Sequence, residues 1–430
     1  MQSRSCPALF ISAPGSSHGK TSVTAALARY HTKQGRKVRV FKAGPDFLDP
    51  MILEKACSHP VYQLDLWLMG ENECQRLVYE AAQDADLILI EGVMGLFDGN
   101  PSSADLAGFL GIPVVVVIDA KGTAQTLGAI AIGLAHYRKN LFFAGVLANS
   151  IASQRHAEMV IEGMPEEVRY LGGIPHVQEF TLPERHLGLV QADEVADIDN
   201  RLSAAADLIA STDLTELPEA IIITAPKSES LLQSLASIRI GVARDTAFAF
   251  IYQANLDLLQ ALGAELMFFS PLVEKNLPDV DSVYLPGGYP ELYLAQLQQN
   301  QTLKDQLKQH YDLGRPIYAE CGGMLYLLES LTDKTGRQGA MVGIMSGHAI
   351  MQGRIHGLGY QSAHFPGGVL RSHTFHHSVI ESSLKEYARG ERLFNTSPGE
   401  KIFQVGRLTA SYLHCYFPSN PAATAQLFLP

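Results

Sequence analysis

A series of short, almost continuously apolar runs constrains the fold of this chain most strongly. Six of them occur in the first half, at residues 8–13, 38–44, 85–93, 112–120, 141–149 and 168–173. Because they do not alternate apolar with polar residues, both faces of each strand should be buried, as in a parallel sheet covered by helices. The segments between them, such as residues 21–35, carry apolar residues at helical spacing. We therefore predict an α/β doubly wound sheet.

A second series of the same kind begins at residue 238. Its apolar runs lie at residues 238–245, 264–271, 281–288 and 316–323, and the tail that follows has short alternating segments typical of a mixed sheet edge. Between the two series, residues 195–212 predict a closing helix. We therefore expect two domains, residues 1–211 and 238–430, joined by a linker at 212–237.

Charge and cysteine content exclude several classes of protein. The net charge of −11 and the pI near 5.7 argue against binding to a nucleic-acid backbone. The five cysteines are scattered and form no CxxC pair, so neither a disulfide framework nor a zinc site is expected. No apolar run reaches the ~18 residues of a membrane span, and the N-terminal run is too short for a signal peptide. We expect a cytoplasmic protein.

The stretch APGSSHGKTS, residues 13–22, is typical of a phosphate-binding loop. In such loops the backbone N–H groups surround phosphates, a lysine (here Lys20) adds positive charge, and a hydroxyl (here Thr21) ligates Mg²⁺. The strict motif would place a glycine where Pro14 stands, so this is a variant loop. A chance Gly-Lys-Thr at a helix start is the alternative, but the position between a strand and a helix favours the phosphate loop.

Four acidic residues follow neighbouring strands of the predicted sheet. Asp46 and Asp49 come after the second run, and Glu91 and Asp98 come at the end of the third. Since ligands of open parallel sheets collect at the carboxyl ends of strands, these carboxylates should converge above Lys20. Mg²⁺ takes one or two carboxylates, and Glu91 is the best candidate. Roles in helix caps or turns are the alternative, above all for Asp98.

The sequence AECGG places Cys321 between a strand and a helix, with small residues two positions before and after it. This is the geometric requirement of a nucleophile elbow, and the helix N-terminus should lower the thiol pKa. A buried structural cysteine is the alternative. Among the later histidines we choose His414 as the base. The N–H groups of Gly288 and Gly322 suit an oxyanion hole.

Together these motifs resemble a known enzyme family. LPGGYPEL, ECGGMLYL and LHCYF resemble the class I (triad-type) glutamine amidotransferase domain in its cobyrinic/cobyric acid synthase branch. APGSSHGKT, KAGPDFLDP, EGVMGLFDG and LANSIASQRH resemble the dethiobiotin-synthetase-like ATP domain of the same enzymes. The resemblance covers essentially the whole chain. It implies an N-terminal P-loop domain followed by a flavodoxin-like amidotransferase domain.

The resemblance also implies a reaction in two parts. Cys321 attacks the side-chain amide of glutamine and releases ammonia, while ATP with Mg²⁺ phosphorylates an acetate group that the ammonia then converts to an amide. The family amidates the a and c acetates of cobyrinic acid, a corrin ring, in cobalamin biosynthesis. Carried onto this chain, the implied roles are ATP binding by Ser17, Gly19, Lys20, Thr21 and Asn149 (at the adenine), Mg²⁺ binding by Thr21, Asp46 and Glu91, and activation of the acetate near Asp49 and Asp98.

The group that orients His414, the identity of the substrate and the class of protein are left open by the sequence. The usual class I amidotransferase triad has a glutamate two residues after the histidine. Here that position holds Tyr416, and other members of this branch are similar in lacking the glutamate, so the group that orients His414 is not identified. Hydrogenobyrinic acid and nickel-sirohydrochlorin are alternative tetrapyrrole substrates. A regulatory P-loop ATPase with an inert second domain is a different class, although Gly15 stands where such ATPases carry a signature lysine. A cysteine hydrolase with a nucleotide-sensing domain is a third possibility. Expected partners are the tetrapyrrole, ATP and L-glutamine, and a homodimer stays open.

Overall fold

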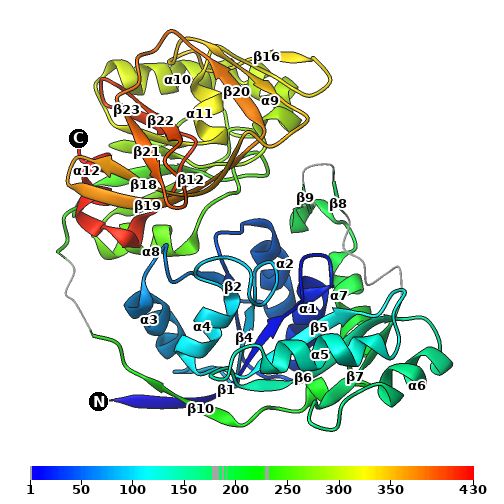
Figure 1. Cartoon of the computed structure of the whole chain (residues 1–430). Coiled ribbons are helices and arrows are strands. Elements are labelled where there is room, and N and C mark those ends of the chain that lie inside the picture. The colour runs from blue at the N-terminus through cyan, green and yellow to red at the C-terminus, as the bar shows by residue number, and fades with distance from the viewer. Residues whose placement is uncertain (1, 177–183, 186–187, 190, 228–231) are drawn as a thin grey trace. The chain divides into compact units, whose positions relative to one another are not determined.

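The chain divides into two compact units, Met1–Ser228 and Glu229–Pro430. A computed structural model describes residues 2–176, 184–185, 188–189, 191–227 and 232–430 of the 430 (Figure 1). Each unit has a central sheet and its own hydrophobic core, and each is described here by itself.

Unit 1 is built on a sheet whose main path runs β3-β2-β4-β1-β5-β6-β7. All neighbours along this path are parallel. The strands are β1 (Ser3–Ser12), β2 (Val38–Ala43), β3 (Tyr62–Leu64), β4 (Leu87–Glu91), β5 (Val114–Asp119), β6 (Phe143–Ile151) and β7 (Tyr170–Pro175). The doubly wound parallel sheet predicted from the apolar runs is confirmed.

Helices cover both faces of this sheet. They are α1 (Lys20–Lys33), α2 (Leu48–Cys57), α3 (Glu71–Ala81), α4 (Ser103–Leu110), α5 (Thr126–His136), α6 (Gln154–Glu162) and α7 (Ile198–Ile209). Helices α1, α2 and α7 pack against one another, and their apolar side chains share one core cluster with those of the sheet. Helices α3 to α6 lie on the viewer's side of the sheet in Figure 1.

The linker predicted at 212–237 instead contains a strand of unit 1. Strand β10 (Ala220–Thr224) pairs antiparallel with β1, from Ser3 opposite Thr224 to Pro7 opposite Ala220. Its sequence AIIIT is an apolar, β-branched run like those of the inner strands, although alternate residues are exposed, so the sequence carried a strand signal that the linker assignment overlooked. The first unit therefore extends past residue 211 to Ser228.

This pairing gives a test of the boundary. A fragment of residues 1–228 should fold and show a cooperative thermal transition by circular dichroism, because it retains every strand of the sheet. A fragment ending at residue 211 leaves the N-terminal half of β1 without its partner and should unfold at a lower temperature or aggregate. Equal stability of the two fragments would contradict the assignment of β10 to unit 1.

Unit 2 has a mixed sheet in the order β12-β11-β13-β14-β23-β22-β21-β18-β19-β24. Its parallel part comprises β12 (Glu265–Phe269), β11 (Arg239–Ala243), β13 (Ser282–Leu285), β14 (Ile317–Glu320) and β23 (Leu408–Ser411). The antiparallel part comprises β22 (Pro398–Val405), β21 (Ala388–Arg392), β18 (Gly357–Phe365), β19 (Gly368–His376) and β24 (His414–Tyr416). The mixed sheet predicted for the tail is thus confirmed.

A smaller sheet and five helices complete unit 2. The sheet has the order β16-β15-β17-β20, with β16 (Gln338–Ala340), β15 (Ser330–Thr332), β17 (His348–Met351) and β20 (Ser378–Glu381). The helices are α8 (Gln253–Ala261), α9 (Leu294–Gln299), α10 (Gln301–Asp312), α11 (Gly322–Leu327) and α12 (Pro421–Phe428).

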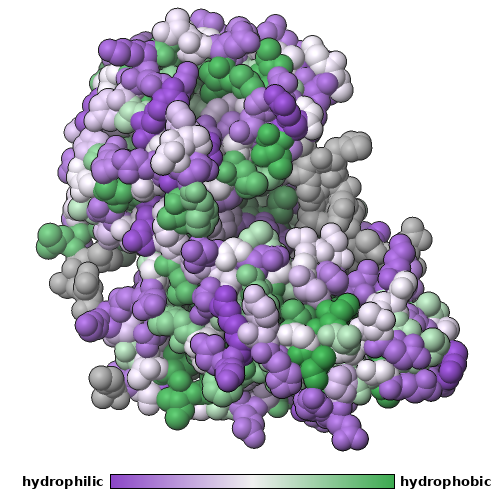
Figure 2. Space-filling view, viewed as in Figure 1, coloured by the Kyte–Doolittle hydropathy of each residue, from purple (hydrophilic) through white to green (hydrophobic). Residues whose placement is uncertain are grey.

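Hydrophilic residues cover much of the face shown in Figure 2, with hydrophobic residues scattered among them. Such scattered apolar side chains are usual on protein surfaces. Among the described residues, no helix combines the length and the apolar character that crossing a membrane requires.

Candidate active sites

The loop between β1 and α1 has the backbone form of a phosphate loop. Ser17 and Gly19 both adopt left-handed conformations, with φ of 64° and 89°. A Cβ atom on Gly19 would overlap with the Asn149 side chain of β6, whose Nδ2 donates to the His18 carbonyl oxygen at 3.1 Å. Position 19 therefore needs glycine for its backbone and for the close approach of Asn149. Asn149 contacts the loop itself.

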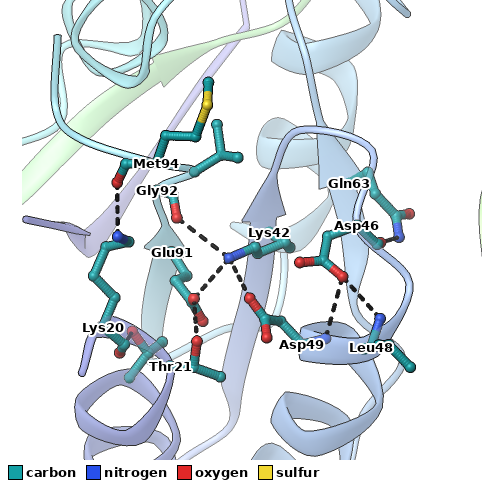
Figure 3. Close-up of polar contacts among 12 residues, drawn as sticks. Lys20, Thr21, Lys42, Asp46, Leu48, Asp49, Gln63, Glu91, Gly92 and Met94 are labelled. Carbon is teal, nitrogen blue, oxygen red and sulfur yellow. Dashed lines mark hydrogen bonds and ion pairs between the residues drawn. The ribbon is translucent and has the colours of Figure 1, made fainter. Parts of the chain in front are cut away.

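Lys20 closes over this loop at the start of α1. Its Nζ donates to the carbonyl oxygen of Gly15 at 2.9 Å. It also donates to the carbonyl oxygen of Met94 at 2.6 Å (Figure 3). Burial, followed by the charge of Lys42, lowers the pKa of Lys20 to about 8. Carbonyl oxygens are weaker partners for an ammonium group than phosphate oxygens are. The contacts that hold Lys20 in this structure are therefore ones that an anionic ligand can replace.

Lys42, at the end of β2, is the centre of a buried charge cluster that the sequence analysis did not single out. Its Nζ lies 2.6 Å from Asp49 Oδ2 and 2.7 Å from Glu91 Oε1 (Figure 3). The same Glu91 oxygen accepts a hydrogen bond from Thr21 Oγ1 at 2.7 Å. Thr21, Asp49 and Glu91 thus meet at one lysine whose side chain is only 3% exposed.

The charges of this cluster are strongly coupled. Burial opposes the charged form of Lys42, but Asp49 and Glu91 outweigh it and raise the Lys42 pKa. Burial would also raise the pKa of Asp49, and the charge of Lys42 lowers it instead. For Glu91, burial wins over Lys42 and raises the pKa to about 7. Glu91 Oε2 is buried and has no hydrogen-bond partner among the described residues, so it can take a further proton or a cation.

Asp46 and Asp98 lie at the margin of this cluster. Asp46 Oδ1 accepts from the backbone N–H of Leu48 at 2.8 Å, at the start of α2, and burial raises its pKa to about 6. Asp98 Oδ2 accepts from the backbone N–H of Gly95 at 2.9 Å, so it closes a turn. Its charge acts on Lys20, which places it near the loop.

In unit 2, Cys321 occupies a sharp turn between β14 and α11. Its φ of 41° and ψ of −106° lie in a region that residues other than glycine rarely adopt. Its backbone N–H donates to the Ser411 carbonyl oxygen at 2.7 Å. A Cβ on Gly323 would overlap with the backbone of Leu285, so the turn admits no larger residue there. The elbow predicted from AECGG is present.

The environment of the thiol differs from what its position predicted. The Cys321 residue is 7% exposed, and burial, then the charge of Glu291, raises the thiol pKa, while the Gly322 N–H lowers it too little to compensate. Burial therefore outweighs the helix N-terminus, and the prediction of a lowered thiol pKa is wrong.

The glycine turn after β13 lies against the elbow. A Cβ on Gly322 would come within 2.9 Å of Gly288 N, so the peptides of these two residues are adjacent. A Cβ on Gly287 would overlap with the His414 ring, which brings the histidine to the same place. The three turns follow β13, β14 and β23, which are neighbouring parallel strands. Gly288, Gly322, Cys321 and His414 thus gather at one sheet edge.

A carboxyl group that the sequence analysis could not name lies beside His414. Glu320 Oε2 is 4.0 Å from His414 Nδ1. Glu320 is fully buried, and it accepts hydrogen bonds from Tyr284 Oη at 2.9 Å, Tyr318 Oη at 3.0 Å and the Cys415 backbone N–H at 2.9 Å. Burial raises the pKa of Glu320 to about 8 and lowers that of His414 to about 3. At neutral pH both groups are therefore predominantly uncharged.

Comparisons with known proteins identify the kind of domain in each unit. Residues 9–190 match the CobQ/CobB/MinD/ParA nucleotide-binding domain, and residues 239–422 match the CobB/CobQ-like glutamine amidotransferase domain. A protein of Stutzerimonas stutzeri named hydrogenobyrinate a,c-diamide synthase is 58% identical over 430 residues, which is 100% of each chain. The chain belongs to the cobyrinate and hydrogenobyrinate a,c-diamide synthase family.

Two further members of the a,c-diamide synthase family extend this result. One from Pseudomonas aeruginosa, also named hydrogenobyrinate a,c-diamide synthase, is 56% identical and covers 99% of this chain and 98% of its own. One from Herminiimonas arsenicoxydans, named cobyrinate a,c-diamide synthase, is 48% identical and covers 98% and 96%. The predicted enzyme class, a glutamine-hydrolysing carbon–nitrogen ligase with a nucleotide-binding domain, is confirmed.

Proposed function

We propose that this enzyme uses ATP and glutamine to amidate the a and c acetate groups of a corrin ring through a phosphorylated carboxylate. The proposal is carried by the whole-length similarity to the a,c-diamide synthases. From the sequence alone, cobyrinic acid is the first candidate substrate. Of the three relatives described above, the two that are 58% and 56% identical are named for hydrogenobyrinate, and the one that is 48% identical is named for cobyrinate. Hydrogenobyrinic acid therefore becomes the first candidate substrate.

The substrate is tested directly by mass spectrometry. Incubation of the enzyme with ATP, glutamine and equal amounts of hydrogenobyrinic and cobyrinic acid should give the a,c-diamide of hydrogenobyrinic acid first. Faster conversion of cobyrinic acid would reverse the order of the two candidates. A lack of amide formation on either ring would refute the function. The homodimer and the cytoplasmic location stay predictions.

In unit 1 the candidate roles follow from the charge cluster. Carboxylates are poor acyl donors. Transfer of a phosphoryl group from ATP to the acetate group makes its carboxyl carbon susceptible to attack by ammonia. The loop around Ser17 and Gly19 would surround the ATP phosphates, and Lys20 would leave its two carbonyl partners for them. Asn149 would lie at the nucleotide, beside the loop that it contacts. Asp49 and Asp98 would face the acetate group.

Residues suited to hold Mg²⁺ lie in the same cluster. The buried Glu91 Oε2 lacks a hydrogen-bond partner among the described residues, and the Thr21 hydroxyl contacts the other oxygen of that carboxylate. These are hard oxygen ligands of the kind that Mg²⁺ prefers, and Asp46 would complete the set. The described residues contain no cluster of three or more His, Cys, Asp or Glu arranged to hold a metal; in nucleotide sites phosphate oxygens supply further ligands. The ion would neutralise phosphate charge during transfer.

In unit 2, Cys321 would attack the side-chain amide of glutamine. His414 would take the thiol proton and pass it to the departing ammonia. The N–H groups of Gly288 and Gly322 would stabilise the oxyanion of the tetrahedral intermediate. Water would then hydrolyse the thioester to glutamate. Because burial raises the pKa of the Cys321 thiol, the attack depends on His414 taking the thiol proton.

We also assign to Glu320 the positioning of His414, in place of the glutamate that the usual class I amidotransferase triad carries two residues after the histidine. It lies on the Nδ1 side of the ring, and three donors fix its carboxyl group. When His414 accepts the thiol proton, the pKa values of the two groups shift toward an ion pair, which stabilises the imidazolium.

Replacement of Glu320 by glutamine should lower the glutamine-dependent rate about 10- to 100-fold and leave the ammonium-dependent rate unchanged. The pH profile of kcat/KM for glutamine should shift as well, which a purely structural role would not cause. Glu381→Gln is a matched control because Glu381 forms an exposed pair with His348 at 3.4 Å. An unchanged pH profile in the Glu320 variant would remove Glu320 from the mechanism.

A further inference from the structure

A buried carboxyl group beside the candidate nucleophile has no role in the reaction described above. Glu291 is 5% exposed, and its Oε1 has no hydrogen-bond partner among the described residues. Burial raises its pKa to about 7, against the weaker effects of a hydrogen bond from its own backbone N–H and of the charge of Lys334. A carboxylate here disfavours the thiolate of Cys321. Since an unpaired buried carboxyl group is costly, its presence at this point suggests a cationic ligand.

The position of Glu291 relative to the elbow is well defined. It lies in the 3₁₀ turn η4 (Pro290–Tyr293), directly after the glycine turn of the candidate oxyanion hole. Pro290 Cδ lies 2.9 Å from the place that a Cβ on Gly322 would take, and η4 packs against α11. The carboxyl group is thus held on the wall of the site by the same turn that would supply the oxyanion donors.

A cavity of about 290 Å³ lies in the same unit. Tyr412 is part of the cavity wall and directly follows Ser411, whose carbonyl oxygen accepts the hydrogen bond from the Cys321 N–H. Glu400 is also part of the wall, and its charge, like that of Glu291, raises the pKa values of both Cys321 and Tyr412. The basic lining residues of the cavity are His356, His376, Arg389, Arg392 and Lys401. Arg392 and His376 approach Glu400 at 3.6 and 3.4 Å, so the lining has positive groups in excess of its one acidic residue.

These two features match the two charged groups of an amino acid. With its side-chain amide at Cys321, glutamine must place an α-ammonium and an α-carboxylate group a few bonds away. We propose that Glu291 selects the α-ammonium group of glutamine and that the basic cavity receives the α-carboxylate. The inference rests on the proposed function. Binding of the ammonium group gives Glu291 its missing partner, and a charge-assisted hydrogen bond in a desolvated site is a strong source of selectivity.

The test compares glutamine with glutaramate, which has the same amide and carboxylate but no α-amino group. The parent enzyme should strongly prefer glutamine in glutamine-dependent amidation. Glu291→Gln should lower kcat/KM for glutamine about 10- to 100-fold and leave kcat/KM for glutaramate nearly unchanged. Glu291→Asp, which keeps the charge, should retain part of the preference. Glu329→Gln is the matched control, since Glu329 is an exposed carboxyl group of the same unit.

Binding without turnover provides a second measurement. In a Cys321→Ala background, isothermal titration calorimetry should show the Kd for glutamine rising about 10- to 100-fold on adding Glu291→Gln, with no change for glutaramate. Equal losses for both compounds would mean that Glu291 supports the pocket or holds the released ammonia, and would overturn the inference. Intact selectivity would overturn it too. A parent enzyme without any glutamine-dependent turnover would refute the proposed function, and this inference with it.

Discussion

Replacing Cys321 by alanine is expected to abolish glutamine-dependent amidation, by more than about 10⁴-fold, because no other group can form the thioester. Amidation with added ammonium should continue at the parent rate, since free ammonia bypasses the glutaminase reaction. Mass spectrometry of the corrin product with each nitrogen source measures both rates. The result would place the release of nitrogen in unit 2 and the activation of the acid elsewhere.

The matched control is Cys57→Ala in unit 1. Cys57 is also a buried free cysteine, and burial raises its pKa to about 11, but it ends α2 and lies outside the elbow. This variant should keep both activities. Loss of the ammonium-dependent reaction in Cys321→Ala would contradict the division of labour between the two sites, provided that the variant folds as the parent does.

The fold could be predicted wherever a strand is buried on both faces. Strands such as β4 and β5 are fully or almost fully buried and appear in the sequence as unbroken apolar runs. Strand β3 has only three residues, too few for a pattern. Strand β10 has the apolar run AIIIT, yet it exposes Ile222 to 75% because it pairs at one end of β1. An apolar run therefore marks a strand better than it reports how deeply that strand is buried.

The site was predictable in its residue types and less so in its electrostatics. The spacing of AECGG locates an elbow, but the burial that raises the thiol pKa depends on neighbours far along the chain, such as Tyr412. Glu320 and His414 are 94 positions apart and meet only because β14 pairs with β23. Lys42 gave one signal that could have been used: it is a lysine at the carboxyl end of a strand that the sequence predicts to be buried on both faces, where a charge needs a partner.

Replacement of Lys20 by alanine is expected to stop amidation from glutamine and from ammonium alike, by about 10²- to 10³-fold. Without the ammonium group, the charge on the phosphates would lose its partner, and the acid would not be activated whatever the nitrogen source. Lys33→Ala is the matched control, because Lys33 lies at the other end of α1 in an exposed pair with Asp207. Lys20→Arg keeps the positive charge but changes the shape and length of the side chain. It therefore separates the contribution of the charge from that of the side-chain geometry.

The lowered pKa of Lys20 adds a signature that distinguishes a phosphate contact from a structural one. In the free enzyme burial and Lys42 hold this pKa at about 8, so above pH 8 a growing fraction of Lys20 is neutral. Bound phosphates favour the charged form, and ATP binding at pH 8.5 to 9 should therefore take up close to one proton. Calorimetry in buffers of different ionisation enthalpy measures this uptake, which Lys20→Ala should eliminate. Normal ammonium-dependent turnover by Lys20→Ala, or the same proton uptake in that variant, would exclude Lys20 from phosphate binding.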